Sequence, residues 1–348
     1  MKKFALWAGM AFAVLFLVLT ILNASWLAPN PAGAPKQIAH RALAPELKPG
    51  VHETCPLATI EEPYNRYLPN TRDSVLRADR MGGWLIEIDA QVSADGVAVL
   101  HSQNALGCLT DGEGLVSETV LEDLQTLDAG HNYTVAGTQE APFRGQGITI
   151  PSLESVLKAL PVRGRVMVHL ASPDPRLPEA VAAAFEASKR DPQAKGDAFY
   201  GSAQAVARIR VIYPEVWAFD PDAARQCTAT YIAQGWSGFL PESCKGRTML
   251  IALDQQTVLW GWPNRLIARM EAHGGEIVIE GPREPVAGEV SGITLPEQLT
   301  EIPSTFNGYV WTDDAFNTLP ALIPRFDNRS QAEIDAAQAA LERRRASN

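Results

Sequence analysis

Two acidic side chains, Glu87 and Asp89, lie two residues apart in the segment 84–101, WLIEIDAQVSADGVAVLH. Successive side chains of a β-strand point to opposite faces, so a strand here places both carboxylates on one face and Ile86 and Ile88 on the other. Two half-buried carboxylates facing the same way are costly unless they are paired or bind a cation. Hard divalent cations take carboxylate oxygen. The spacing therefore indicates a candidate metal site.

A β-hairpin is predicted directly after this strand. Asp95-Gly96 is typical of a two-residue turn, in which both central residues have φ > 0. Such a turn brings His101 back to the neighbourhood of Asp89. An edge hairpin with a few solvated polar groups is the alternative interpretation of this segment taken alone. The strand pairs expected are Ala94 with Val97, Val92 with Val99 and Ala90 with His101.

Composition limits the classes of function. The chain has 348 residues, 46% of them hydrophobic, which is enough for one large domain or two modest ones. Its formal net charge is −10. Nucleic acids and anionic membrane surfaces bind clustered Lys and Arg, so neither is expected as the main partner. A local positive pocket for a small anionic substrate is compatible with this charge.

The N-terminal segment is long and apolar enough to cross a membrane. Residues 4–22 carry no charge and follow Lys2-Lys3; as a helix they span roughly 28 Å. We interpret residues 1–26 as an uncleaved single-pass anchor and the Pro- and Gly-rich residues 27–36 as a linker. Lys2-Lys3 would stay cytoplasmic and leave the rest of the chain outside the cytoplasm, on the periplasmic side in a bacterium. A cleaved signal peptide is the alternative.

The cysteines fit an oxidising compartment. Four are present and none forms a C-x-x-C pair, so a zinc or redox motif is not expected. Two disulfides are the simplest interpretation. Of the three connectivities we favour Cys55 with Cys108 and Cys227 with Cys244; free buried thiols are the alternative.

Strands alternate with helices from residue 37 onward, which predicts parallel βαβ units. Eight such strands, with the hairpin strand set aside as an insertion, predict an α/β fold: a (β/α)8 TIM barrel over residues 37–325, followed by a polar helix in 326–348. The eight strands begin near residues 37, 84, 165, 197, 216, 248, 276 and 309. The site of such a barrel lies at the C-terminal ends of its strands. The polar residues expected there are His40, Arg41, Glu87, Asp89, His169, Asp220, Glu280 and Asp313.

Three further local predictions concern the segments between these strands. Residues 42–67 are expected to form a long loop. Ser117 is expected to be the N-cap of a helix that runs to Leu127. The basic residues 343–345 are expected to lie on the solvated face of the last helix.

Several short motifs occur in the order seen in the glycerophosphodiester phosphodiesterase family, which the chain resembles from about residue 35 to 325. The blocks are His40-Arg41, Asn70-Thr71, Glu87-x-Asp89, Asp95-Gly96, His101, the run 109–114 and the run 119–130, with later landmarks at 150–154 and 308–313. The family's fold, a (β/α)8 barrel with an inserted hairpin, agrees with the strand count. Each block is weak alone, and the ordered set is specific.

The resemblance implies roles for individual residues. His40 and His101 would be the general acid and base, and Arg41 would bind the phosphate. Glu87 and Asp89 would bind a divalent cation, usually calcium or magnesium. Metal and guanidinium can stabilise charge on phosphoryl oxygens, and two histidines can exchange protons near neutral pH.

Three positions depart from the family pattern. Pro69 stands where the family has a glutamate before Asn-Thr, and Ser102 stands where it has an aspartate after the second histidine. His169 aligns with the glutamate that normally completes the metal site; imidazole removes a negative charge and favours softer metals. The carboxylates that could replace the missing one are Glu53, Glu62 and Glu280. The histidines expected to be structural are His52, His131 and His273.

The predicted function is metal-dependent hydrolysis of a glycerophosphodiester or a lysophospholipid-like phosphodiester, catalysed by the His40 and His101 pair with Glu87, Asp89 and His169 as metal ligands. Two alternatives remain. One is a degenerate barrel that binds a lipid headgroup or a protein partner without turnover. The other is a phospholipase D-type or lyase relative, whose cyclic phosphate product would accumulate.

Overall fold

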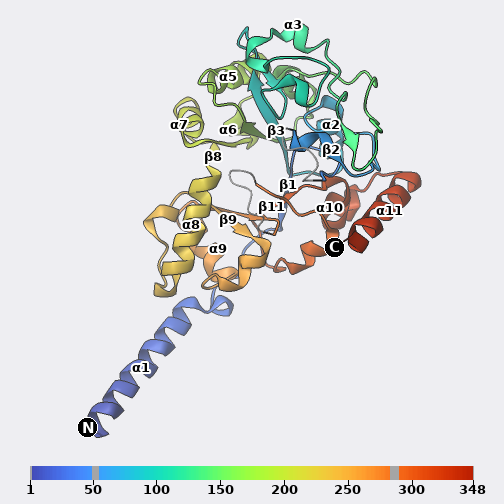
Figure 1. Cartoon of the computed structure of the whole chain (residues 1–348). Helices are drawn as coiled ribbons and strands as arrows, with labels where there is room; N and C mark the ends of the chain where they lie inside the picture. The colour runs from blue at the N-terminus through green and yellow to red at the C-terminus, as the bar shows by residue number, and fades with distance from the viewer. Residues whose placement is uncertain (1, 49–54, 283–289, 348) are drawn as a thin grey trace. The chain divides into compact units, whose positions relative to one another are not determined.

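The computed structural model describes residues 2–48, 55–282 and 290–347 (Figure 1). The chain divides into two compact units. Unit 1 comprises Met1–Lys36, Pro221–Ser291 and Thr300–Val310. Unit 2 comprises Gln37–Asp220, Gly292–Leu299 and Trp311–Asn348.

Unit 2 contains five neighbouring parallel strands in the order β8-β7-β6-β3-β1. Strand β3 pairs with β1 through Leu85 and Ile38, and with β6 through Asp89 and His169. The pairing continues from β6 to β7 and from β7 to β8. The bounds are β1 (Lys36–Ala39), β3 (Leu85–Val92), β6 (Val166–Leu170), β7 (Ala198–Gly201) and β8 (Trp217–Phe219).

Unit 1 contains β9 and β10, and β11 runs from unit 1 into unit 2 as β1 does. The backbone N–H of Lys36 donates to Gly308 O (2.9 Å) in unit 1, and that of His40 to Thr312 O (3.0 Å) in unit 2. The order β8-β7-β6-β3-β1-β11-β10-β9 is the parallel sheet of a (β/α)8 barrel, which confirms the predicted fold and strands. The remaining bounds are β9 (Thr248–Ala252), β10 (Glu276–Glu280) and β11 (Tyr309–Thr312).

Several helices of unit 2 begin where a polar side chain accepts from a free backbone N–H group. Thr71, Ser152 and Ser202 accept from the third residue after each. The regular helices are α2 (Arg72–Arg80), α4 (Leu153–Ala159), α5 (Leu177–Ala187), α7 (Ala203–Ile212), α10 (Ala315–Leu322) and α11 (Gln331–Ser347), with short α3 (Leu121–Leu124) and α6 (Pro192–Lys195). Ile86 and Ile88 are fully buried in the hydrophobic core of this unit. The alternate residues of β3, Glu87 and Asp89, therefore face the other side of the sheet.

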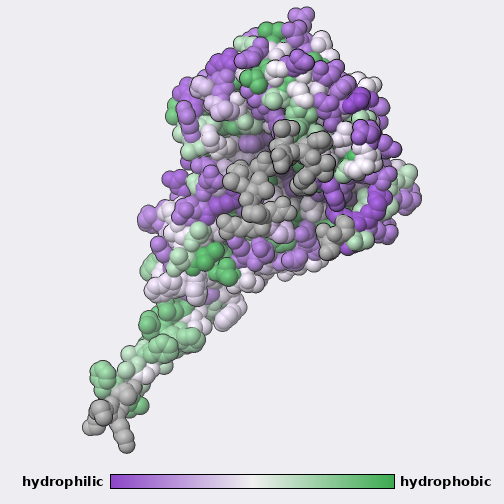
Figure 2. Space-filling model, viewed as in Figure 1, coloured by the Kyte–Doolittle hydropathy of each residue, from purple (hydrophilic) through white to green (hydrophobic). Residues whose placement is uncertain are grey.

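Unit 1 contains α8 (Pro221–Gln234), α9 (Asn264–Glu271) and the N-terminal helix α1 (Lys2–Asn23). Helix α1 is long and apolar enough to cross a membrane, and no residue of its Leu6–Asn23 window is buried. The apolar surface of α1 is visible in Figure 2. Its 22 residues correspond to about 33 Å of helix, close to the hydrocarbon thickness of about 30 Å.

The hairpin forms, but its predicted register is wrong by one residue. Strand β4 (Ala98–Leu100) pairs antiparallel with β3, and the partners are Ala90 with Leu100, Gln91 with Val99 and Val92 with Ala98. Ser93 N donates to Val97 O (3.0 Å), so three residues form the loop instead of two. Gly96 at φ 79° supplies the left-handed position that a three-residue hairpin needs. His101 N donates to Asp89 O (3.1 Å), so the hairpin does bring His101 back to Asp89 as predicted.

The predicted helix from Ser117 to Leu127 is also wrong. Val116–Glu118 is a 3-10 turn, and α3 begins only at Leu121. The capping oxygen comes from the hairpin loop, because Asp95 Oδ1 accepts from Leu121 N (3.1 Å). In the expected 42–67 loop, the short strand β2 (Thr59–Ile60) pairs with β5 (Thr134–Val135).

Both predicted disulfides are present. Cys55 is bonded to Cys108 in unit 2, and Cys227 to Cys244 in unit 1. All four cysteines are therefore used.

The C-terminal basic residues are not all solvated, which corrects the prediction for 343–345. Arg344 is 6% exposed. It contacts Asp314 (3.0 Å) and Glu61 (3.3 Å) and donates to Thr294 O (3.0 Å). Asp314 is itself buried, so a solvated arginine here would leave a buried carboxylate without this counterion.

Arg344→Met tests this anchoring of α11. We expect a loss of about 3–5 kcal/mol in the free energy of unfolding, because the variant leaves the Asp314 carboxylate buried without its cation. Urea titration of the full chain in detergent measures it. Arg345→Met is the matched control, since the Arg345 to Glu297 pair lies at the exposed surface and should matter little. Equal stability of the two variants would contradict the analysis.

Candidate active site

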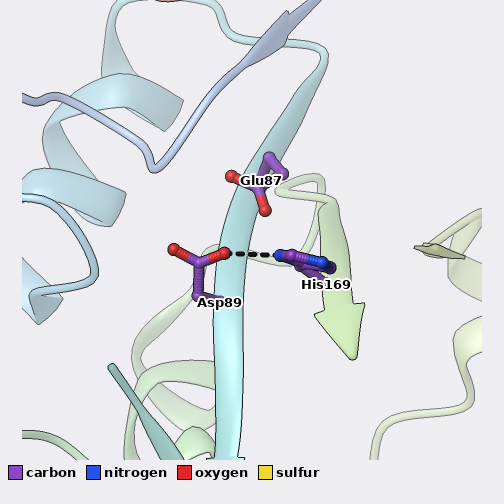
Figure 3. A group of neighbouring side chains, drawn as sticks. All are labelled: Glu87, Asp89 and His169. Carbon is purple, nitrogen blue, oxygen red and sulfur yellow. Dashed lines mark hydrogen bonds and ion pairs between the residues drawn. The ribbon is translucent and has the colours of Figure 1, made fainter. Parts of the chain in front are cut away.

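Glu87, Asp89 and His169 form a cluster on neighbouring strands of unit 2 (Figure 3). One ligand atom from each of the three lies within 4.8 Å of the others. The carboxylates come from β3 and the imidazole from β6, and the parallel register places Asp89 directly opposite His169. Sequence spacing predicted the shared face of the two carboxylates, the family resemblance added His169, and the sheet register brings the three together.

The two carboxylates are buried and have different partners. Glu87 accepts from Arg41 N (2.6 Å) and Tyr200 OH (2.8 Å). Burial, followed by the charge of Asp89, raises the pKa of Glu87 well above its usual value. Burial acts in the same sense on Asp89, but the hydrogen bond and charge of His169 outweigh it and lower the pKa of Asp89. The pair therefore favours a single negative charge unless a cation is added.

Asn70 fixes the orientation of Asp89. Its Oδ1 accepts from Asp89 N (2.8 Å), and its Nδ2 donates to Asp89 Oδ2 (2.8 Å) and to Ser102 Oγ (2.7 Å). Asn70 is 3% exposed and has φ 59°, a conformation that asparagine tolerates better than most residues. His169 Nδ1 contacts the other Asp89 oxygen at 2.7 Å.

Arg41 lies at the turn after β1 with φ 53°. This turn points its backbone N–H at Glu87 Oε2. Burial works against its charge, yet the carboxylates of Asp313 and Asp89 raise the pKa of Arg41. Its Nε atom is buried and has no hydrogen-bond partner within the described part of the chain. A buried guanidinium N–H without a partner is costly, and an anion would satisfy it.

His40 is held by Asp313, which lies at the end of β11. The distance from His40 Nδ1 to Asp313 Oδ1 is 2.6 Å, and Gly292 N donates to the other oxygen of Asp313 (2.9 Å). Burial by itself raises the pKa of the Asp313 carboxyl, but the charge and hydrogen bond of His40 outweigh this effect, so the pKa of Asp313 is lowered. An ionised carboxylate accepts, so Nδ1 carries the proton and Nε2 is left facing Glu87 Oε2 at 4.0 Å.

His101 follows the hairpin and is 5% exposed. Its Nδ1 lies 2.5 Å from Gln103 O, and a carbonyl only accepts, so Nδ1 carries the proton. Burial lowers the pKa of His101, which keeps the ring neutral. Its Nε2 is buried without a hydrogen-bond partner among the residues described. It lines a small pocket of about 20 Å³ with Asn70 and Tyr133.

Unit 2 therefore contains all six predicted site residues, and the one suggested replacement carboxylate described in this unit, Glu62, does not join the cluster. Glu62 is 68% exposed and pairs with Arg343 (3.4 Å). Glu280 belongs to unit 1, where it pairs with Arg225 (2.9 Å), and Glu53 lies outside the described residues. Of the histidines expected to be structural, His52 is also outside them, and His131 lies 3.6 Å from Asp128.

Sequence reasoning placed Asp313 at the rim of the barrel and Asn70 in a family motif without giving either a role, and it missed Tyr200 as a member of the site. Asp313 ends a predicted strand and Asn70 belongs to a recognised motif, so both had a signal. Tyr200 had none, since an aromatic residue in a buried strand is ordinary core.

The cluster fits a divalent cation. Two buried carboxylate groups share one face, and the pKa of Glu87 rises partly because Asp89 is charged. A cation removes that repulsion. Carboxylate oxygen suits calcium and magnesium, whereas the third donor, imidazole nitrogen, suits softer metals.

Part of the chain is similar in sequence to known proteins. Residues 64–179 match the model of the glycerophosphoryl diester phosphodiesterase family. An uncharacterised Mycobacterium tuberculosis protein is 35% identical over 123 residues, covering 32% of this chain and 40% of the relative. A glycerophosphodiester phosphodiesterase of Bacillus subtilis is 30% identical over 126 residues, 35% of this chain and 43% of that protein. The matched regions span about two fifths of these relatives.

Solved structures share the fold over more of the chain. The glycerophosphoryl diester phosphodiesterase domain of an uncharacterised M. tuberculosis protein aligns with a TM-score of 0.58 at 20% identity, covering 84% of this chain and 99% of that one. An Oleispira antarctica phosphodiesterase in complex with the product sn-glycerol-3-phosphate gives 0.54 at 18% identity, covering 83% and 96%. Over residues 64–179 the chain is thus similar in sequence to the glycerophosphodiester phosphodiesterase family, and over most of its length it shares the fold of these solved structures.

Replacing His169 tests the metal preference of the cluster. We expect His169→Glu to raise the affinity for calcium and magnesium relative to zinc, on the order of 10-fold, because the third donor becomes a carboxylate. Calorimetric titration of the full chain in detergent measures binding without requiring turnover. His131→Glu is the control, because His131 lies outside the cluster. Identical metal preferences in both variants would show that His169 is not a ligand.

Proposed function

We propose that unit 2 hydrolyses a phosphodiester of the glycerophosphodiester or lysophospholipid type. The observation that carries this proposal is a pair of buried atoms, Arg41 Nε and His101 Nε2, which have no hydrogen-bond partner among the residues that the structure describes and lie in the same site as two buried carboxylates. A phosphodiester supplies an anionic acceptor for Arg41 and a hydroxyl proton for His101. The product named for the Oleispira antarctica relative, sn-glycerol-3-phosphate, supports this substrate class.

In the proposed reaction, the two histidines have different roles. His101 is neutral and has its Nε2 lone pair free, so it removes a proton from the attacking hydroxyl, either water or the neighbouring glycerol hydroxyl. The new P–O bond forms as the bond to the leaving alcohol breaks. His40, oriented by the hydrogen bond from its Nδ1 to Asp313, gives its Nε2 proton to the leaving oxygen. If glycerol oxygen attacks first, water then opens the cyclic phosphate.

The other charged residues stabilise the phosphoryl group. Arg41 neutralises the substrate's single negative charge and the charge that develops on the phosphoryl oxygens. The divalent cation would be held by Glu87, Asp89 and His169. The family resemblance favours calcium or magnesium, whereas the imidazole nitrogen of His169 favours a softer metal. A bound cation would supply Lewis-acid stabilisation of the same oxygens. Asn70 and Tyr200 hold the carboxylates in position.

We further propose that α1 anchors the chain as a single span and leaves the barrel outside the cytoplasm, on the periplasmic side in a bacterium. Two disulfides support an oxidising compartment. In this arrangement residues 1–26 are the anchor, 27–36 the linker, 37–325 the barrel domain and 326–348 the terminal helix. An anchored site suits a lipid-derived substrate.

A second function, headgroup binding without turnover, is favoured by one observation. His169 Nδ1 lies 2.7 Å from Asp89 Oδ1, so this pair of side chains is already in mutual contact without a cation between them. A barrel in which this pair persists would bind phosphate through Arg41 without a metal.

Hydrolysis by the full chain distinguishes the two functions. We expect release of glycerol phosphate from glycerophosphodiesters, lost with chelator, restored by added metal and reduced by about 10²-fold or more in His40→Ala, because a positioned proton donor is removed. His131→Ala is the control and should keep its activity. A folded chain that binds substrate but shows no turnover with any divalent metal would support the binding function. Accumulation of cyclic phosphate would instead identify a lyase-type reaction.

Asp313 is predicted to act on catalysis by positioning His40. Asp313→Asn removes the carboxylate that holds His40 Nδ1 and so fixes the orientation of the ring. We therefore expect kcat to fall by about 10²-fold with little change in KM. Asp111→Asn, at a carboxylate outside the site, is the control. A proportional rise in KM with unchanged kcat would assign Asp313 to substrate binding instead.

A further inference from the structure

Outside α1, the described part of unit 1 exposes four large aromatic side chains, which we call the aromatic collar. Trp26 and Phe239 are each 77% exposed, Trp236 is 49% exposed and Trp260 is 42% exposed. Scattered apolar residues are normal at a protein surface, whereas a grouped set marks an interaction site. These four residues therefore indicate an interaction site only if they lie close together.

Two collar residues belong to the segment 236–239, which packs against the C-terminal end of α1. Asn23, the last residue of α1, donates from Nδ2 to Trp236 O (2.9 Å). Gly238 faces Leu22 so closely that an added Cβ would lie 3.2 Å from the Leu22 Cβ atom. Phe239 is the next residue along the chain.

The other two residues reach the same helix end by short links. Trp26 is in the 3-10 turn Ser25–Leu27, directly after α1, and this turn packs against α9. Trp260 O accepts from Tyr231 OH (2.6 Å). Tyr231 OH in turn accepts from Arg269 Nη1 (2.6 Å), and that nitrogen also donates to Asn23 Oδ1 (3.1 Å).

The junction between α1 and the rest of unit 1 is braced. Arg269 donates to Leu22 O (2.8 Å), a carbonyl that the end of the helix leaves without an intrahelical partner. Asn264 N donates to Ser25 Oγ (3.0 Å). The disulfide between Cys227 and Cys244 closes the segment that contains Trp236 and Phe239.

We infer that the collar is a membrane-contact surface, embedded in the headgroup region of the phospholipid bilayer that α1 crosses. Helix α1 is about as long as the hydrocarbon layer is thick, so its end at Asn23 falls at the interface. Tryptophan is enriched at that depth because its ring is apolar and its N–H can bond to water or headgroups. Figure 2 shows apolar surface on α1 and continuing onto unit 1 at the end of that helix.

This surface would give α1 a second role. A flexible tether lets a domain turn freely above the membrane, whereas a braced helix with an aromatic collar holds unit 1 at one depth and orientation. The inference rests on the proposed membrane span and not on the proposed hydrolysis. A bilayer is favoured over a second copy of the chain because the collar is continuous with the exposed apolar surface of α1.

Depth-dependent quenching tests the inference on the full chain in phospholipid vesicles. Because the native cysteines form disulfides, Phe239→Cys provides a single thiol for an environment-sensitive fluorophore. The quenchers are phospholipids with a nitroxide near the headgroup or deep in the acyl chain. Leu15→Cys in α1 reports the span, and Val211→Cys, at a 69% exposed position on α7 in unit 2, is the exposed apolar control.

We expect position 239 to be quenched several-fold more by the shallow nitroxide than position 211, and position 15 to be quenched by the deep one. Quenching at 15 but not at 239 would overturn the collar while leaving the span intact. Absence of quenching at both would overturn the collar together with the span. Shielding of 239 from aqueous iodide without lipid quenching would assign the surface to a protein partner or second copy. Turnover of a water-soluble glycerophosphodiester is measured in the same samples. A failure of the proposed hydrolysis is thereby distinguished from a failure of the collar inference.

Discussion

Burial of two carboxylate groups on one face of β3 is the constraint around which the site is built. Such burial is unfavourable unless each oxygen has a partner. The partners of Glu87 and Asp89 come from the turn after β1, from β6, from β7 and from the residue before the N-cap of α2. Neutralising these two groups therefore joins four separate segments of unit 2 and places Arg41 and the histidines around one point.

The strand pattern made much of this predictable. Alternation of Ile86 and Ile88 with acidic residues identified β3 and its polar face, and the count of βαβ units gave the barrel. In a parallel barrel the strand ends share one rim, so His40, His169 and Asp313 were expected there without knowledge of contacts. The cysteine pairs followed from the same placement of loops and are present as predicted.

What the sequence could not supply depends on tertiary context. The hairpin register depends on whether Gly96 alone or both Asp95 and Gly96 adopt positive φ. A two-residue loop and a three-residue loop are both compatible with this sequence. The oxygen that caps the helix near Ser117 belongs to Asp95. It accepts from Leu121 N, and the two residues are 26 positions apart in the sequence. Arg344 looked like part of a solvated basic run because its buried counterion, Asp314, lies on another element.

The hydrogen bond between His40 and Asp313 joins residues 273 positions apart. A ribosome makes the first of them early and the second near the end of synthesis. Strand β1 likewise cannot pair with β11, its neighbour in the sheet, until β11 has been synthesised. The nascent chain must therefore hold an exposed strand edge and an incomplete site while almost all of the barrel is still being made. A chain released early would keep the motif residues from His40 to His101 and lack the group that orients the first histidine.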